Sequence, residues 1–171
     1  VILVRKPNVP DRPAAMVGRR LFGNPDELFL QSHPKRGLLT PAEVRAVALS
    51  AMDIGPASIV WDVGAGSGSV AIEAAQIARD GRVFAIEPDP LNLSILRANL
   101  ERHGCSNTTV LPVAAWFEEA ELNILRQPTE GAVTRVGAGV AAGSVRAAPL
   151  DNLIEGQVDY LKVDTELTDH H

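Results

Sequence analysis

A glycine-rich segment near residue 60 carries the residue types that point most directly to ligand binding. An acidic residue, Asp62, comes just before three glycines at alternate positions, Gly64, Gly66 and Gly68. Glycine lets the chain turn tightly, and it lets backbone amides approach a ligand without a Cβ in the way. Such amides can hold a carboxylate, while the acidic side chain can hold a cationic group. The segment therefore predicts a site for a ligand that carries both charges; its full sequence is Val60-Trp61-Asp62-Val63-Gly64-Ala65-Gly66-Ser67-Gly68.

A second acidic residue, Glu87, follows the next strand-like run of the chain. In dinucleotide sites a carboxylate at this place accepts hydrogen bonds from ribose, but the glycines there follow the pattern G-x-G-x-x-G. Here the third glycine comes one residue earlier. S-adenosylmethionine offers a ribose, an amino group and a carboxylate but no phosphate, so these residues favour it over NAD. The alternative is that Gly64–Gly68 form only a tight turn and that Glu87 is a solvated charge at a strand end.

The elements that must position these residues are short apolar runs that alternate with longer segments of helical periodicity. A nearly continuous apolar run with β-branched residues, such as 58–63, is typical of a strand buried on both faces. Alternation of strand and helix predicts right-handed crossovers and a mostly parallel sheet with helices on both faces. We therefore expect a Rossmann-like α/β fold of the class I methyltransferase type. The predicted strands are 58–63, 82–86 and 107–113, and the predicted helices are 70–78 and 89–104.

The segment Thr40-Pro41-Ala42-Glu43 predicts the start of an earlier helix. The side chains of Thr40 and Glu43 would cap each other's backbone amides, and Pro41 would occupy the first helical position. Val44 and Val47, followed by two alanines, recur at helical spacing and predict a buried stripe. Before this helix we expect an N-terminal strand and a Pro-rich linker in residues 1–37, with the strand at Val1–Val4 and a short amphipathic piece at 26–31. Residues 38–171 then form the cofactor-binding domain.

The C-terminal third has a weaker pattern. Residues 118–125 form either a strand or a short helix, and 131–148 show no clear period. One helical turn is predicted at 150–154, and a fourth strand at 158–163. A complete fold of this type needs about three more strands, so we expect a domain truncated after its fourth strand. An unpaired fourth strand would favour a homo-oligomer.

Composition narrows the function classes. A formal net charge of −5 argues against a nucleic-acid binder, since such proteins neutralise phosphates. No apolar run is long enough to cross a bilayer, so no membrane partner is expected. The single cysteine, Cys105, fits a reducing cytoplasm and is not expected to be a nucleophile. The histidines lack the spacing of a metal site, so no metal is expected.

Residues 1 to about 87 resemble the decarboxylating precorrin methyltransferase family of cobalamin biosynthesis (CbiT, or the C-terminal domain of CobL). The resemblance extends beyond the glycine loop and lies in the stretches Lys35-Arg36-Gly37-Leu38-Leu39-Thr40-Pro41-Ala42-Glu43-Val44-Arg45 and Val60–Glu73. It implies that Thr40, the loop from Gly64 to Gly68, Glu87, and the pair Ala114 and Ala115 surround S-adenosylmethionine. The methyl acceptor would then be a tetrapyrrole.

From about Phe84 onward the chain also resembles the FkbM family, whose members are often O-methyltransferases of sugars or natural products. The resemblance lies in Phe84–Asn92, Leu96–Leu100, Pro112–Trp116, Leu150–Leu153 and Tyr160–Glu166. In that family the last motif usually continues as Glu-Gly-x-Glu, whereas here Glu166 is followed by Leu167-Thr168-Asp169. The acceptor would then be a hydroxylated metabolite. A truncated module that binds the cofactor without catalysis is the alternative from another class.

Asp164 and Glu166 follow the predicted fourth strand, beside the switch point where sheets of this kind bind ligands. They are the candidate general bases or substrate contacts. The alternative, that both are solvated carboxylates at a strand end, stays open.

Overall fold

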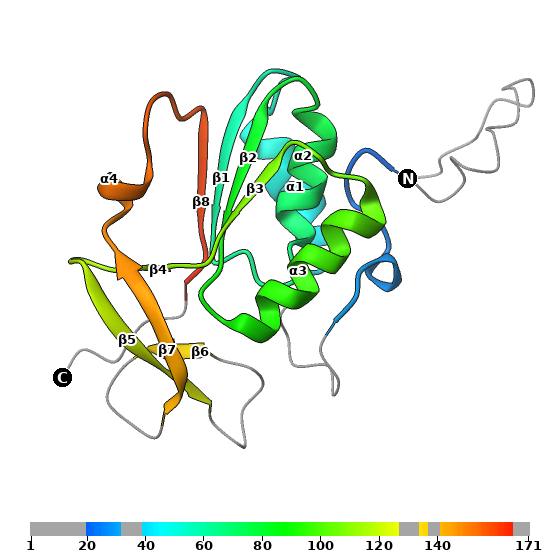
Figure 1. Cartoon of the computed structure of the whole chain (residues 1–171). Helices are drawn as coiled ribbons and strands as arrows, with labels where there is room; N and C mark the ends of the chain where they lie inside the picture. Colours follow the sequence, from blue (N-terminus) through cyan, green and yellow to red (C-terminus); the bar gives the residue numbers. More distant parts are fainter. Residues whose placement is uncertain (1–19, 32–38, 127–133, 137–140, 166–171) are drawn as a thin grey trace, which may run out of the picture.

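A computed structural model describes residues 20–31, 39–126, 134–136 and 141–165 of the chain (Figure 1). Its main sheet has four strands in the order β3-β2-β1-β8, and all three neighbouring pairs are parallel. The predicted α/β fold and its four parallel strands are therefore confirmed. The strands are β1 (Ile59–Val63), β2 (Arg82–Ile86), β3 (Thr108–Leu111) and β8 (Tyr160–Val163).

The sheet is covered on both faces because its central strands are apolar on both. Val60 and Val83 face one hydrophobic cluster, together with the helices α1 (Ala42–Met52), α2 (Ser69–Ile77) and α3 (Pro90–His103). Trp61 and Val63 face a second cluster, which the short helix α4 (Leu150–Leu153) joins. Helices thus lie on both faces, as predicted, although three are on one face and a single turn is on the other (Figure 1).

Helix α3 begins and ends as the sequence predicts. The side chain of Asp89 accepts a hydrogen bond of 2.8 Å from the backbone N–H of Leu91, and Pro90 opens the helix. Gly104 ends it with φ of +68°, a conformation that favours glycine.

The start of α1 differs from the expectation. The residue before the helix is Pro41, which offers no side-chain hydrogen bond to cap it. Because the helix starts at Ala42, Thr40 lies one residue outside the capping position, and its carbonyl oxygen instead accepts a hydrogen bond from the guanidinium of Arg45. The predicted apolar stripe is also wrong: Val44 and Val47 are exposed, whereas Arg45 and Leu49 are buried.

A second sheet lies between β3 and β8 in the chain. The sequence leaves 118–125 open between a strand and a short helix, and the strand is confirmed as β5 (Ala120–Arg126); the rest of this sheet is not predicted. Strands β5 and β7 pair antiparallel, and β4 adds to β7 in parallel. β7 consists largely of Ala, Gly and Ser, which have low strand propensity, so the pairing with β5 decides its conformation. The order is β4-β7-β5-β6, with β4 (Ala114–Ala115), β5 (Ala120–Arg126), β6 (Thr134–Val136) and β7 (Ala141–Ala148).

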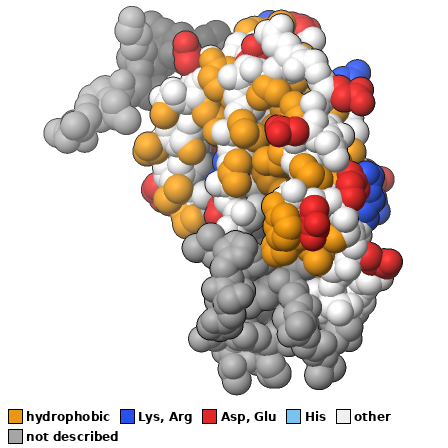
Figure 2. Space-filling model, turned by 90° about the vertical axis from the view of Figure 1, so that its left-hand side faces the viewer, with side chains coloured by type: hydrophobic (Ala, Val, Ile, Leu, Met, Phe, Trp, Pro, Cys, Tyr) orange, Lys and Arg blue, Asp and Glu red, His pale blue; other side chains and the backbone are white. Residues whose placement is uncertain are grey.

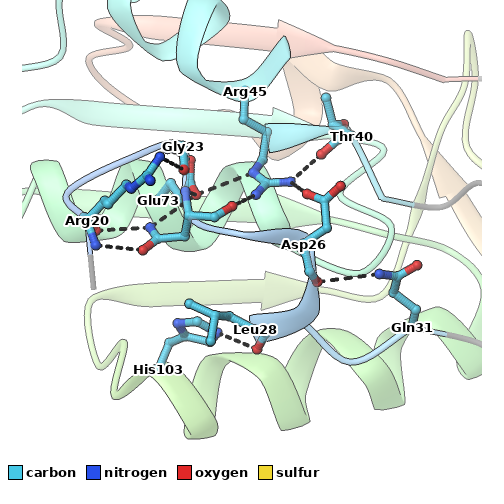
Figure 3. Close-up of polar contacts among 10 residues, drawn as sticks. Arg20, Gly23, Asp26, Leu28, Gln31, Thr40, Arg45, Glu73 and His103 are labelled. Atoms are coloured by element: carbon cyan, nitrogen blue, oxygen red, sulfur yellow. Dashed lines mark hydrogen bonds and ion pairs between the residues drawn. The ribbon is translucent and has the colours of Figure 1, made fainter. Parts of the chain in front are cut away.

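Residues 20–31 are held against the helices by a buried polar network (Figure 3). The carboxylate of Glu73, fully buried on α2, accepts hydrogen bonds from the backbone N–H groups of Gly23 (2.8 Å) and Asn24 (2.7 Å). The buried Arg45 lies 3.3 Å from Glu73 and 2.8 Å from Asp26, which opens the 3-10 turn η2 (Asp26–Leu28). This segment is therefore joined to the domain by buried charges. The boundary placed after residue 37 stays a prediction, and the strand predicted at 1–4 lies outside the described residues.

β8 lies at the end of the main sheet, with β1 as its neighbour. Its side chains Leu161 and Val163 are 46% and 55% exposed. Seen from the side of β8 and α4, hydrophobic side chains gather over the middle of the surface (Figure 2). None of the helices in the described residues is long and apolar enough to span a membrane.

Candidate functional site

The glycine loop lies where the strand order of the main sheet reverses. From β1 the chain builds β2 and β3 on one side, and it later places β8 on the other side of β1. Ligands of open α/β sheets bind beyond the carboxyl ends of the strands at such a point. Gly64 directly follows β1 and Asp164 directly follows β8, so both residues lie at this edge.

The loop has the left-handed turns that its glycines predict. Gly64, Gly66 and Gly68 have φ of +80°, +56° and +83°. The backbone N–H groups of Gly64 and Ala65 both donate to the carbonyl of Ile86 at 2.9 Å, which fixes the loop to the end of β2. A Cβ on Gly64 would lie 2.1 Å from the carbonyl oxygen of Asp164, so this glycine also allows β8 to approach.

Glu87 contacts the loop directly. Its carboxylate accepts a hydrogen bond of 2.8 Å from the N–H of Gly66, and others from the N–H of Asp89 (2.9 Å) and the side chain of Asn92 (3.3 Å). Burial raises the pKa of Glu87, and the two backbone hydrogen bonds oppose this rise. The acid after β2 and the loop after β1 are thus brought together, as the sequence predicts.

Asp62 has a partner that the sequence analysis missed. The ammonium of Lys162 on β8 lies 2.9 Å from Asp62 Oδ1, because the two residues are register partners on adjacent parallel strands. The second carboxylate oxygen, Oδ2, is buried and has no hydrogen-bond partner among the described residues. Aligning the ends of the first and fourth predicted strands would have revealed the pair.

Ser67 is buried, and its carbonyl oxygen accepts a hydrogen bond of 2.9 Å from the side chain of Asn99. The same Asn99 amide donates to the carbonyl of Leu30 at 3.0 Å and accepts from its N–H at 2.7 Å. One side chain of α3 therefore connects the glycine loop to the N-terminal segment.

The remaining candidates lie in different settings. Thr40 is half-buried just before α1. Ala114 and Ala115 form β4, where Ala114 packs in the core of the second sheet. Asp164 is exposed, its Oδ2 is 3.7 Å from Lys162, and its N–H donates to the carbonyl of Val63. Glu166 lies outside the described residues.

Cys105 does not have the environment of a nucleophile, since burial raises the pKa of its thiol to about 11. In the described part of the chain, His, Cys, Asp and Glu side chains form no group of three or more that could hold a metal ion.

The residues at the loop fit S-adenosylmethionine. Oδ2 of Asp62 is a buried acceptor to which no described residue donates, and such an atom suits a ligand ammonium group. The sequence profile of the precorrin methyltransferase domain family matches residues 31–157, well over half of the chain. The chain belongs to this family. The match includes most of the stretch that also resembles the FkbM family, and that second resemblance stays an interpretation of the sequence.

Named relatives agree with the family. Cobalt-precorrin-6B C(15)-methyltransferase (decarboxylating) from Salmonella typhimurium is 45% identical over 87 residues, which cover 51% of this chain and 44% of that protein. A probable enzyme of the same name from Pyrobaculum calidifontis is 41% identical over 90 residues, covering 52% and 45%. The chain spans about half the length of the curated relatives it matches.

Solved structures agree with the fold. Precorrin-6y C5,15-methyltransferase from Geobacter metallireducens matches with a TM-score of 0.50 and 38% identity, covering 54% of this chain and 47% of that one. The C-terminal domain of precorrin-6Y C5,15-methyltransferase from Rhodobacter capsulatus matches with a TM-score of 0.51 and 27% identity, covering 57% and 50%. The Rossmann-like methyltransferase fold is thereby confirmed for the shared half.

Proposed function

We propose that this chain is an S-adenosylmethionine-dependent precorrin methyltransferase that acts in the cytoplasm on a tetrapyrrole. The observation that carries the proposal is the contact between Glu87 and Gly66 in a chain of this family. It brings the acid after β2 and the glycine loop after β1 to one place. The tetrapyrrole comes from the names of the relatives, which are precorrin methyltransferases.

Each part of the cofactor has a candidate partner. The carboxylate of Glu87 would accept the ribose hydroxyls, and Asp62 would face the amino group. The loop amides from Gly64 to Gly68, including those of Ala65 and Ser67, would approach the carboxylate. Thr40, Ala114 and Ala115 are proposed to flank the cofactor, on the resemblance to the family. When bound, S-adenosylmethionine supplies an electrophilic methyl group on its sulfonium.

The chain's own contribution to methyl transfer is mainly alignment. The buried loop and Glu87 would hold the cofactor so that an acceptor atom can approach in line, at roughly 3–3.5 Å. An acceptor carbon needs no base from the protein at the moment of transfer, so binding and orientation would be sufficient. Lys35 and Arg36 are proposed to bind carboxylates of the tetrapyrrole; both lie outside the described residues.

A hydroxyl acceptor is the second candidate, and the position of Asp164 favours it. Its carboxylate is exposed beside the glycine loop, where a base would be needed to take the hydroxyl proton. Glu166, two residues further, is proposed for the same role on the FkbM resemblance.

Calorimetry with S-adenosylmethionine, S-adenosylhomocysteine and NAD tests the cofactor. We expect both sulfur ligands to bind and NAD not to bind, and binding of NAD alone would overturn the proposal. Transfer of a labelled methyl group to a precorrin or to a hydroxylated acceptor then separates the two acceptor classes. Binding of the cofactor with transfer to neither would identify the chain as a cofactor-binding module.

A further inference from the structure

The strongest unassigned feature of the site is the ammonium of Lys162. It contacts three oxygens at the ends of β1 and β8: Asp62 Oδ1 at 2.9 Å, the Gly64 carbonyl at 3.3 Å, and Asp164 Oδ2 at 3.7 Å. The ammonium donates hydrogen bonds to the first two oxygens, and Asp164 adds an ion pair without a hydrogen bond. Lys162 lies beyond the residues 31–157 that the family profile matches.

The carboxylate of Asp62 depends on this lysine. Asp62 is only 1% exposed, and a carboxylate so far from water needs a cation or several hydrogen bonds to offset its lost hydration. The side chain of Lys162 is 17% exposed, so the lysine keeps access to solvent at the edge where the ligand would enter.

We propose that Lys162 is a resident cation of the cofactor site: it holds Oδ1 of Asp62 and leaves only the second oxygen, Oδ2, for the amino group of S-adenosylmethionine, next to a like charge. This inference rests on the proposed function and concerns the part of the cofactor that is recognised. One carboxylate then faces two cations. The ligand ammonium must displace Lys162 or lie next to a like charge, and either outcome removes most of its contribution to affinity.

The consequence is an unusual specificity. The chain recognises the nucleoside and the carboxylate of the cofactor, and the amino group adds little. Removing Lys162 leaves Asp62 buried without the ion pair that the described residues give it, and the ligand ammonium then becomes the cation that pairs with it. Lys162 is therefore a specificity-determining residue.

The test compares S-adenosylhomocysteine with its analogue that lacks the α-amino group, by calorimetry on the full chain. For the unaltered protein we expect the two dissociation constants to agree within about threefold. In Lys162→Met we expect S-adenosylhomocysteine to bind about tenfold more tightly than the analogue. Lys162→Gln, which keeps a hydrogen-bond donor, should show the same preference if the methionine variant does not fold.

Arg146→Met is the matched control. Arg146 is a cation on β7 that pairs with Glu119 at 3.3 Å, in the second sheet and in solvent. Its removal should leave both dissociation constants unchanged.

Two results would overturn the inference. If the unaltered protein prefers S-adenosylhomocysteine to the deaminated analogue by tenfold or more, Asp62 is available to the ligand and Lys162 does not compete. If the lysine variants lose affinity for both ligands equally, Lys162 binds the ligand carboxylate instead. In both cases the proposal that S-adenosylmethionine is the cofactor remains valid. If the unaltered protein does not bind S-adenosylhomocysteine at all, the proposed function is overturned, and this inference with it.

Discussion

The carboxylate of Glu87 accepts a hydrogen bond of 2.8 Å from the backbone N–H of Gly66, so the end of β2 is tied directly to the glycine loop. The same carboxylate is the proposed acceptor for the ribose hydroxyls. Glu87→Gln keeps one acceptor oxygen but removes the charge. Because hydrogen bonds to charged groups contribute about 1.5–3 kcal/mol, we expect a loss of affinity for S-adenosylhomocysteine of about tenfold to a hundredfold.

Calorimetry measures this loss, and Glu119→Gln is the matched control. Glu119 is an exposed glutamate that bonds Arg146 and Asn152 outside the loop. Its replacement should leave the affinity unchanged. Equal affinity of Glu87→Gln and the unaltered protein would remove Glu87 from the site.

The buried environment of Glu87 also predicts a pH dependence. Burial raises the pKa of Glu87 above its usual 4.5, so the folded chain binds this proton more tightly than the unfolded chain does. The unaltered protein therefore loses stability as the pH rises from about 4.5 through the raised pKa. Glu87→Gln lacks this loss, so its free energy of unfolding should improve relative to the unaltered protein as the pH increases. Urea titrations at several pH values measure the difference, and a constant difference would contradict the assignment.

Gly64 and Gly104 form a matched pair for testing the approach of β8. Both have positive φ, of +80° and +68°, but only at Gly64 would a Cβ meet backbone, the Asp164 carbonyl at 2.1 Å. Gly104→Ala should cost about 1–2 kcal/mol, from the backbone conformation alone. Gly64→Ala should cost about 3 kcal/mol or more, because β1 and β8 must also separate. Urea unfolding of the two variants measures both losses in the free energy of unfolding. Equal losses would show that β8 does not pack closely against Gly64.

Glu73 connects the N-terminal segment to α1 and α2 (Figure 3). It is fully buried, as is Arg45 at 3.3 Å. Replacing it by Gln leaves a buried guanidinium with one carboxylate fewer, and breaking such a pair costs about 3–5 kcal/mol. The exposed pair of Glu119 and Arg146 provides the comparison, since Glu119→Gln should leave the free energy of unfolding nearly unchanged. Similar unfolding free energies for both variants would mean that residues 20–31 are not fixed as described.

The parts of the fold that were predictable are those where local pattern and tertiary packing agree. Strand β1 is apolar except for Asp62 because both of its faces are buried, and Asp89 caps α3 within its own helical turn. The glycine loop and Glu87 follow strand ends, so their meeting needs only that β1 and β2 be neighbours.

The parts that were missed depend on partners distant in the sequence. Thr40 fits a capping motif locally. The buried Arg45, however, donates a hydrogen bond to the backbone carbonyl of Thr40, and the helix starts one residue later than the motif predicts. β7 has little intrinsic strand propensity and forms against β5. Lys162 meets Asp62 only because β8 crosses to the far side of β1 in a fixed register.

The double contact of Asn99 has a practical consequence. Its amide group holds the Leu30 N–H at 2.7 Å and the Ser67 carbonyl at 2.9 Å, so two distant segments share a single side chain. Deuterium exchange at the Leu30 amide should therefore slow when a ligand orders the loop, although Leu30 need not touch the ligand. This amide offers a spectroscopic reporter of occupancy that needs neither a labelled cofactor nor a known acceptor.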